Sequence, residues 1–319
     1  MSKLLLIDGH AILHRAYHAL PPNFTAPDGT QTNAVFGFTN MLLRLISDLK
    51  PTHLVVAFDL PQPTFRQQLY TAYQGKRPDM EGNLKEQIPL VHELLDALKI
   101  KYFEVGGYEA DDIIGTISCH AELGSASLAN ASNAHSGEIP KQVRDDNTEV
   151  IIVTGDRDML QLINENVKVC VPVKGLSETK TYDEALLRAE YRVEPCQWID
   201  VKALKGDASD NYLGVPGIGP KTAEELIAKF GTLEEVYKNL GKLKPNIAKK
   251  LAEGMESAGL GKKLAAIVCD VPLKFVLQET FIDIIDWKSG VHYMRSRLGF
   301  KSIPDKIEKD YDNRQSSLF

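Results

Sequence analysis

Three carboxylates are crowded into the stretch "VGGYEADDIIGTI", where Glu109, Asp111 and Asp112 stand within four residues just before an apolar run. On a helix, Glu109 and Asp112 would share a face, with Asp111 about 100° round the axis. Carboxylates at this spacing repel one another, although the helix dipole partly compensates acids in a first turn. The stretch is either an ordinary acidic helix start or part of a cation site, and the rest of the chain decides between the two.

The second source of carboxylates is a set of three apolar, β-branched runs that end on aspartate. In "LLLID", "HLVVAFD" and "EVIIVTGDRD", the acids Asp8, Asp59, Asp156 and Asp158 stand where buried parallel strands would finish. Helical patterns such as "NLKEQIPLVHELLDALK" lie between the runs, which predicts an α/β core with a doubly wound, mostly parallel sheet. Ligands bind at the carboxyl ends of such strands, so we expect these aspartates to converge there.

A further acidic pair stands in "LKGDASDN", where Asp207 and Asp210 are three residues apart and can face the same way from a turn. An oxygen-only ligand set, in a chain whose four cysteines form no CxxC pair, favours Mg²⁺ or Mn²⁺ over zinc. So many acids suit two ions better than one, and two ions about 3.5–4 Å apart are the arrangement used for in-line displacement at phosphodiesters. The candidate metal ligands are Asp8, Asp59, Glu109, Asp111, Asp112, Asp156, Asp158, Asp207 and Asp210.

The stretch "GVPGIGPKTAEELIAKFGT" combines a glycine-rich turn with the start of an amphipathic helix. Gly217 and Gly219 let the backbone approach a ligand closely, and the helix N-terminus offers N–H groups to a phosphate. Lys221 and Thr222 add a charge and a hydroxyl, and the combination is typical of elements that bind the DNA backbone without reading its sequence. An ordinary solvated helix pair is the alternative interpretation.

The loop at 60–83 interleaves cations with aromatic rings. Arg66, Lys76 and Arg77 can neutralise phosphates, while rings such as Tyr73 can stack on unpaired bases. The loop is longer than an ordinary connection, and such loops are often functional. A surface hairpin with a few buried aromatics is the alternative interpretation.

The net charge of −6 argues at first sight against a nucleic-acid partner. The charge is segregated, however, because residues 221–263 carry nine lysines against six glutamates. No apolar run is long enough to span a membrane, and the N-terminus lacks a signal-peptide core. We therefore expect a cytoplasmic, nucleoid-associated protein with DNA and not a membrane as its partner.

These motifs together resemble the 5′ nuclease (5′-3′ exonuclease, flap endonuclease) domain of bacterial DNA polymerase I and its stand-alone relatives. The resemblance is carried, in order, by "LLLIDGHAILHRAYHALP", "TFRQQLYTAY", "GYEADDIIGT", "VIIVTGDRDMLQL", "GDASDN", "GVPGIGPKTA" and "LGFKSI". It implies a PIN-like, mostly parallel sheet flanked by helices, a helical arch over the site, and a C-terminal helix–three-turn–helix (helix-hairpin-helix) subdomain. It also implies two Mg²⁺ ions, K⁺ at the glycine-rich hairpin, and hydrolysis of 5′ flaps or RNA primers in DNA replication and repair.

The resemblance also assigns roles to single residues. The family's tighter metal site is matched by Asp8, Asp59, Glu109, Asp111 and Asp112, and its second metal site by Asp156, Asp158, Asp207 and Asp210. Arg15 and Arg77 match basic residues that engage the scissile phosphate, and Tyr73 matches an aromatic residue of the arch.

One position departs from the family pattern. Relatives usually read Tyr-Lys-x-x-Arg-Pro where this chain reads "YQGKRP" from Tyr73 to Pro78, so Gln74 replaces the arch lysine. On a helix, Lys76 would lie about 200° round the axis from position 74. Lys76 can therefore take over the role of the missing lysine only if the segment is irregular.

We predict a nuclease core over 1–175, which includes the arch region 60–90 and a flexible insertion at 122–148, then a helical DNA-binding subdomain over 176–302 and a polar tail over 303–319. No polymerase domain follows, so the sequence predicts a free-standing monomer that acts on DNA with 5′ flaps, nicks or RNA primers, beside a separate DNA polymerase. Two other functions remain open: a ribonuclease of the PIN type, and a non-catalytic binder of DNA junctions.

Overall fold

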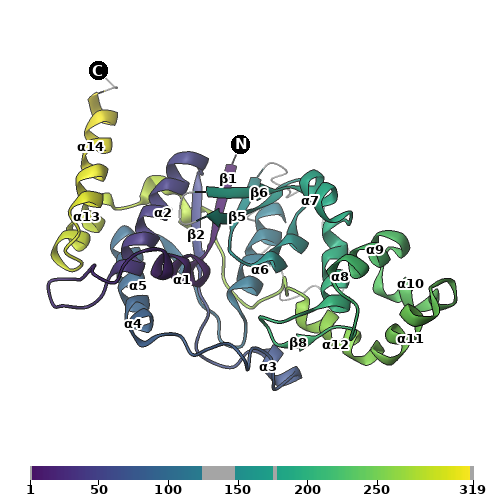
Figure 1. The fold of residues 1–319 in the computed structure, drawn as a ribbon. Helices are drawn as coiled ribbons and strands as arrows, with labels where there is room; N and C mark the ends of the chain where they lie inside the picture. The colour runs from purple at the N-terminus through teal and green to yellow at the C-terminus, as the bar shows by residue number, and fades with distance from the viewer. Residues whose placement is uncertain (1, 124–147, 175–177, 317–319) are drawn as a thin grey trace.

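The computed structural model describes residues 2–123, 148–174 and 178–316. Its centre is a six-stranded sheet in the order β3-β2-β1-β4-β5-β6 (Figure 1). Neighbouring strands are parallel except for β5 and β6, which confirms the predicted mostly parallel sheet. The strands are β1 (Ser2–Asp8), β2 (His53–Ala57), β3 (Lys101–Phe103), β4 (Thr148–Val153), β5 (Val167–Lys174) and β6 (Glu178–Tyr182).

Helices cover both faces of the sheet, and the side chains of β1 alternate between two cores. Leu5 and Ile7 pack on the face that carries α1 (Gly9–Ala19), α2 (Asn33–Leu49), α5 (Gln87–Leu98), α13 (Trp287–Ser296) and α14 (Ser302–Ser316). Leu4 and Leu6 pack on the face that carries α6 (Ala110–Leu123), the 3₁₀ helix η2 (Arg157–Leu162) and α8 (Trp198–Lys205). Burial on both faces explains why the strands read as continuous apolar runs.

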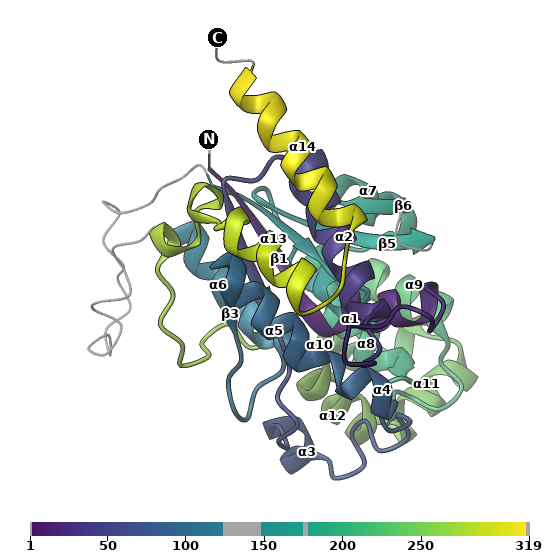
Figure 2. The ribbon, with the colours of Figure 1, turned by 90° about the vertical axis from the view of Figure 1, so that its left-hand side faces the viewer.

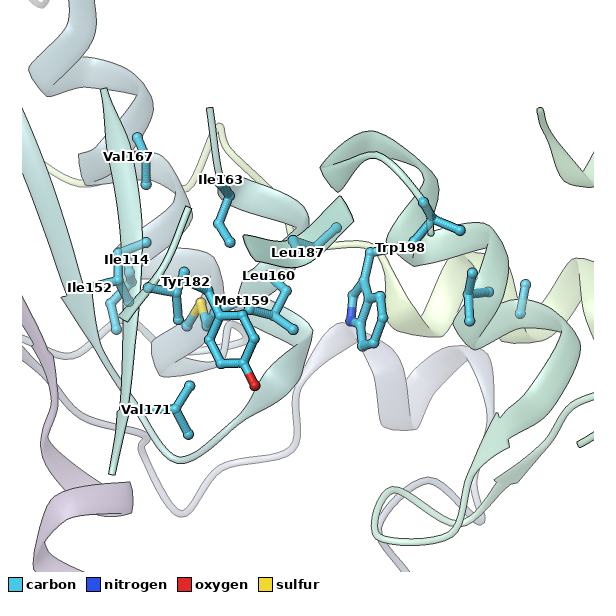
Figure 3. Packing of buried hydrophobic residues seen from close by; sticks show 14 of the residues in the cluster. Ile114, Ile152, Met159, Leu160, Ile163, Val167, Val171, Tyr182, Leu187 and Trp198 are labelled. Carbon is cyan, nitrogen blue, oxygen red and sulfur yellow. The ribbon is translucent and has the colours of Figure 1, made fainter. Parts of the chain in front are cut away.

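The second core continues from the sheet into a helical region, which Figure 1 shows at the right. Trp198 is fully buried there, in the same cluster as Met159 and Leu187 (Figure 3). The region comprises α7 (Glu184–Tyr191), α8, the short hairpin of β7 (Gly206–Asp207) and β8 (Tyr212–Leu213), α9 (Pro220–Phe230), α10 (Leu233–Lys238), α11 (Pro245–Glu253) and α12 (Met255–Ala265).

After α12 the chain returns to the sheet. Phe281 forms an antiparallel bridge with His53, and α13 packs against α5 (Figure 2). The predicted boundaries differ from this arrangement in two places: β6 extends the core sheet to Tyr182, and α14 occupies most of the predicted polar tail, with Ile303 and Ile307 buried. The polar edge strand "ETKTY" and a helix anchored by two apolar side chains carry little periodic signal, so sequence patterns miss both.

The predicted arch region 60–90 is helical only in part. Between α3 (Phe65–Leu69) and α4 (Gly82–Lys85) the chain runs through turns, where Gly75 and Pro78 disfavour a helix. Gln74 has a φ of 56°, in the left-handed region. The predicted insertion 122–148 lies, apart from residues 122, 123 and 148, outside the described residues. Within the described residues, no helix has both the length and the apolarity that a membrane span requires.

Candidate active site

The aspartates at the strand ends meet at one edge of the sheet, as the apolar runs predict. Asp8 caps α1: one oxygen accepts a backbone N–H of the first turn at 2.9 Å, and the other accepts the Thr154 hydroxyl at 2.8 Å. Asp59 accepts the N–H of Ala110 at 2.7 Å, which joins the end of β2 to the start of α6. Asp156 caps η2 through its side chain. The same carboxylates therefore cap helices and form the site.

We call Asp8, Asp59, Glu109, Asp111 and Asp156 the first acidic group, because the charges of the other four all act on Asp111. The resemblance assigns Asp156 to the second metal site instead, and its charge also acts on Asp158. Burial, with the carboxylates of Asp59 and Asp156, raises the pKa of Asp8 to about 7. Burial and four neighbouring carboxylates raise the pKa of Asp111 well above its ordinary value. Burial also raises the pKa of Glu109 to about 7, and Asp59 adds to the shift. The fold thus holds together negative charges that a bound cation would stabilise.

Asp158, Asp207 and Asp210 form the second acidic group, between η2 and the β7–β8 hairpin. Each offers a carboxylate oxygen, and the three oxygens lie within 4.8 Å of one another. In the part of the chain that the structure describes, this is the one trio of His, Cys, Asp or Glu side chains that meets this distance. Burial and the carboxylate of Asp156 raise the pKa of Asp158 to about 7, so the two acidic groups adjoin.

Asp112 is placed differently from the other predicted ligands. Arg66, which is only 2% exposed, donates to both of its oxygens at 2.7 and 2.8 Å. The backbone N–H groups of Glu109 and Val268 donate to the same two oxygens at 3.1 and 2.9 Å. With these four donors, the Asp112 carboxylate is occupied by Arg66 instead of facing the first acidic group. A buried carboxylate needs such a cation, which explains the pairing.

Arg66, predicted to contact DNA, is instead buried at the start of the arch region. It also donates to the carbonyls of Leu264 at 2.9 Å and Ala266 at 2.7 Å, at the C-terminal end of α12. A second ion pair, 3.2 Å long, joins Arg66 to Glu109. Arg66 therefore ties the start of the arch to two acidic side chains and to a segment about 200 residues away.

The rest of the arch bends inward onto the acidic groups. The Tyr73 hydroxyl donates to Glu109 at 3.2 Å, and its ring is buried instead of being free to stack on a base. The Gln74 amide donates to Glu109 at 3.4 Å and to Asp210 at 3.3 Å. Arg77 donates to the same oxygen of Asp210 at 2.7 Å. Position 74 and Arg77 thus face the second acidic group together, although a turn and not a helix brings them there.

Arg15 and Lys76, also predicted as catalytic basic residues, differ in their exposure. Arg15 is partly buried on α1, the helix that Asp8 caps. Lys76 is exposed in the turn between Gln74 and Arg77. The structure thus brings Arg77, but not Lys76, into contact with a carboxylate of the predicted site.

Sequence reasoning missed a lysine in the middle of the site. Lys202 on α8 is 4% exposed, and its ammonium group forms ion pairs with Asp158 and Asp207. Burial lowers the pKa of Lys202, but the two carboxylates raise it above its ordinary value, so the side chain is charged. A signal was present: this lysine stands within the apolar run "VKAL", five residues before Asp207.

The glycine-rich hairpin lies on the helical side, before α9. Gly217 has a φ of 79°, which a residue with a side chain adopts at a cost, and Gly219 caps a helix whose first residue is proline. Lys221 is exposed and Thr222 half-buried on the first turn of α9. The Lys250 ammonium of α11 donates to the Gly217 carbonyl at 3.1 Å, so a cation already stands at this turn.

Two family models match the chain. One, described as the 5′-3′ exonuclease N-terminal resolvase-like domain, matches residues 3–129, and the other, the 5′-3′ exonuclease C-terminal SAM fold, matches residues 193–288. Together they cover more than half of the chain. The chain belongs to the 5′-3′ exonuclease family. The first match contains the arch and most of the first acidic group, and the second contains Asp207, Asp210 and the glycine-rich hairpin.

Curated relatives of this 5′-3′ exonuclease family member are DNA polymerases I. That of Bacillus caldotenax is 38% identical over 318 residues, or 99% of this chain and 34% of the relative. That of Caldicellulosiruptor bescii is 39% identical over 308 residues, or 96% of this chain and 33% of the relative. The chain thus spans about a third of the length of the curated relatives that it matches.

Solved structures share the fold at lower identity. The T5 5′-exonuclease with bound zinc has a TM-score of 0.59 at 20% identity, with 97% of each chain covered. The bacteriophage T5 flap endonuclease in complex with DNA and metal ions has a TM-score of 0.61 at 19% identity, with 97% of each chain covered. The Rad2 catalytic core with DNA substrate has a TM-score of 0.57 at 17% identity, with 97% of this chain and 91% of that chain covered. These similarities confirm the predicted PIN-like α/β fold.

Both acidic groups offer oxygen ligands only, which fit a hard divalent cation. We expect millimolar Mg²⁺ to raise the melting temperature, and to raise it more at pH 8 than at pH 5.5. The folded-state pKa values of Asp8, Glu109 and Asp158 lie near 7, above their ordinary values, so the metal-free protein loses stability as the pH rises towards 7. Protons compete with the ion below that pH. Melting curves in EDTA and in Mg²⁺ at both pH values measure this, and identical curves at pH 8 would contradict it.

Proposed function

We propose that the chain is a metal-dependent 5′-3′ exonuclease and 5′-flap endonuclease. It hydrolyses phosphodiesters of DNA and of RNA primers to give 5′-phosphates, in replication and repair. The observation that carries the proposal is the convergence of two adjoining acidic groups beneath an arch whose Arg77 reaches Asp210. Membership of the 5′-3′ exonuclease family supports the same reaction.

The metal ligands in this proposal are the members of the two acidic groups, with two Mg²⁺ ions that Mn²⁺ can replace. When bound, the ions supply activation of the attacking water and stabilisation of the leaving oxygen. Asp112 stays within the site but acts through its pair with Arg66, which fixes the start of α6. Arg15 and Arg77 neutralise charge that develops on the scissile phosphate, and Lys76 contributes from the arch surface.

The proposed substrate is DNA with a 5′ flap, a nick or an RNA primer. Lys221, Thr222, Gly217 and Gly219 would bind the phosphates of its duplex part, with K⁺ at the hairpin carbonyls. Solved relatives of this fold hold DNA, and the curated relatives are DNA polymerases I, which supports a DNA polymerase as a functional partner. We propose a monomer that works in the cytoplasm at the nucleoid.

Cleavage assays separate this function from its two rivals. A 5′-flap DNA and a structured single-stranded RNA are incubated with the protein, with and without Mg²⁺. The proposed nuclease cuts the flap only with Mg²⁺, whereas a PIN-type ribonuclease cuts the RNA in preference. Binding of the flap without cleavage of either substrate would favour the junction binder and overturn the proposal.

Gln74→Lys is expected to increase the single-turnover cleavage rate. The side chain at position 74 reaches Glu109 and Asp210, beside the Arg77 contact, so an ammonium there would meet charge that grows in the transition state. Removing one such contact elsewhere costs about 10²–10³-fold in rate, and restoring one would recover part of that. Lysine tolerates the left-handed backbone, since Lys50 and Lys99 adopt it with φ of 46° and 57°.

The matched controls for this variant are Lys76→Ala and Arg77→Ala on the same flap at fixed salt. Lys76 is exposed and Arg77 contacts the site, so we expect the arginine change to cost the larger factor. If Lys76→Ala collapses the rate while Gln74→Lys leaves it unchanged, Lys76 serves as the arch lysine and this interpretation of the arch is wrong.

A further inference from the structure

The ammonium group of Lys202 lies between two carboxylates of the second acidic group. Lysine is rarely buried unless it is paired, and this one is 4% exposed on a helix whose neighbouring residues Val201, Ala203 and Leu204 are also buried. Its two partners, Asp158 and Asp207, approach from different elements, η2 and β7. Lys202 thus joins, through its two ion pairs, two segments that lie far apart in the sequence.

The charges of the second acidic group are largely balanced without any ion. Lys202 pairs with Asp158 and Asp207, and Arg77 pairs with the third carboxylate, Asp210, at 2.7 Å. Ser209 also donates to Asp207, through its backbone N–H at 2.7 Å and through its hydroxyl.

We propose that Lys202 is a built-in cation of the second acidic group: it holds Asp158 and Asp207 together in the metal-free protein and lowers the affinity of this group for a divalent cation. A divalent ion that binds the carboxylate oxygens of Asp158 and Asp207 would lie close to the Lys202 ammonium, which already pairs with them. The two positive charges would repel each other at this short distance. The ion therefore binds only if the ammonium shifts or shares its partners. The proposal rests on the proposed metal-dependent function, but it concerns the affinity of one site and not the reaction.

Lys202→Met tests this, because methionine keeps much of the side-chain volume and removes the charge. The readout is Mn²⁺ binding at pH 8, followed by the electron paramagnetic resonance of the free ion, together with melting temperatures in EDTA. In the wild type we expect one Mn²⁺ to bind tightly and a second at least tenfold more weakly. In Lys202→Met the second Mn²⁺ should bind at least tenfold tighter than in the wild type. The melting temperature should fall in EDTA and recover with Mn²⁺.

The matched control is Lys205→Met, one turn further along α8. Its ammonium lies 5.0 Å from the centre of the Trp198 ring and pairs with neither Asp158 nor Asp207 among the described contacts. Its charge acts on Asp158 and Asp207 only from a distance, so Lys205→Met should change Mn²⁺ binding far less than Lys202→Met does. If Lys205→Met tightens the second site as much as Lys202→Met does, the effect is one of general charge and the proposal is overturned.

A second variant covers the case in which Lys202→Met does not fold in EDTA. Lys202→Gln keeps a hydrogen-bond donor for one carboxylate, and its second Mn²⁺ should also bind more tightly than in the wild type. Unchanged or weaker binding of the second ion in both variants overturns the proposal. The assay contains no DNA, so a protein that shows the predicted Mn²⁺ affinities but cuts no substrate would refute the proposed function and leave this inference standing.

Discussion

Asp111→Asn is expected to abolish cleavage of a 5′-flap DNA while the flap still binds. The Asp111 carboxylate lies at the start of α6, where the charges of Asp156, Asp8, Glu109 and Asp59 all act on it. Its loss removes charge where the proposed ions would bind, and one lost electrostatic contact of this kind costs at least about 10²–10³-fold in rate. The hairpin before α9 lies in another element and would keep the phosphate contacts that we propose for it. Single-turnover cleavage and gel-shift binding in Mg²⁺ measure the two effects separately.

Asp112→Asn is the matched control, one residue along the same helix. The Asp111 carboxylate is buried among like charges, so its replacement by a neutral amide should raise the melting temperature in EDTA. The Asp112 carboxylate is paired with Arg66, so its replacement should lower the melting temperature. Near wild-type cleavage by Asp111→Asn, or the same sign of the stability change in both variants, would mean that the roles of these neighbours are wrongly assigned.

The sheet edge that carries the site could be predicted from the sequence because its signal is local. Apolar runs buried on two faces identify the strands, and a polar residue directly after such a run must lie at the carboxyl end of the sheet. Asp8, Asp59 and Asp156 follow this rule, and the structure holds each of them as a cap or backbone acceptor. Local spacing likewise predicted that Asp207 and Asp210 face the same way from one turn, whereas their grouping with Asp158, which the structure shows, came only from the family resemblance.

The pairings inside the site could not be predicted, because they depend on contacts between distant segments. Arg66 reads as an exposed cation of a polar loop, and only the folded chain reveals that it is buried against Asp112 and a carbonyl 200 residues away. Lys202 stands within an apolar run, which hints at burial, but only the folded chain reveals that its partners are Asp158 of η2 and Asp207 of β7. In both cases the buried cation is the counter-ion of an acid from a distant segment.

In the arch, the helix that the family resemblance implies disagrees with the conformations that the local residues favour. A helical arch would point Gln74 and Lys76 in different directions, and the glycine and proline around them argue against that helix. In the structure Gln74 takes a left-handed φ, so the turn itself directs its amide towards Glu109 and Asp210. Backbone conformation at one residue therefore decides which side chains of the arch face the acidic groups.

Arg66→Met is expected to be the most destabilising of the single changes discussed here. It leaves the Asp112 carboxylate buried without its cation, and breaking a buried pair from one side costs about 3–5 kcal/mol. It also removes the hydrogen bonds that tie the arch to the carbonyls of Leu264 and Ala266. Urea unfolding in EDTA should show the loss as a lower midpoint. Replacing the partner as well, in Arg66→Met with Asp112→Leu, should recover most of it, since well-packed apolar residues often substitute for a buried ion pair.

Arg44→Met is the matched control for this change. Arg44 pairs with Asp48 at 3.1 Å on the exposed side of α2, where such a pair contributes about 0.3–0.5 kcal/mol. Its unfolding midpoint should stay close to the wild-type value. The alternative for Arg66 is the DNA contact that the sequence predicts. In that case Arg66→Met would unfold near the wild-type midpoint and bind flap DNA with a salt dependence shallower by about one counter-ion. That pair of results would restore Arg66 to the DNA interface and remove it from the support of the site.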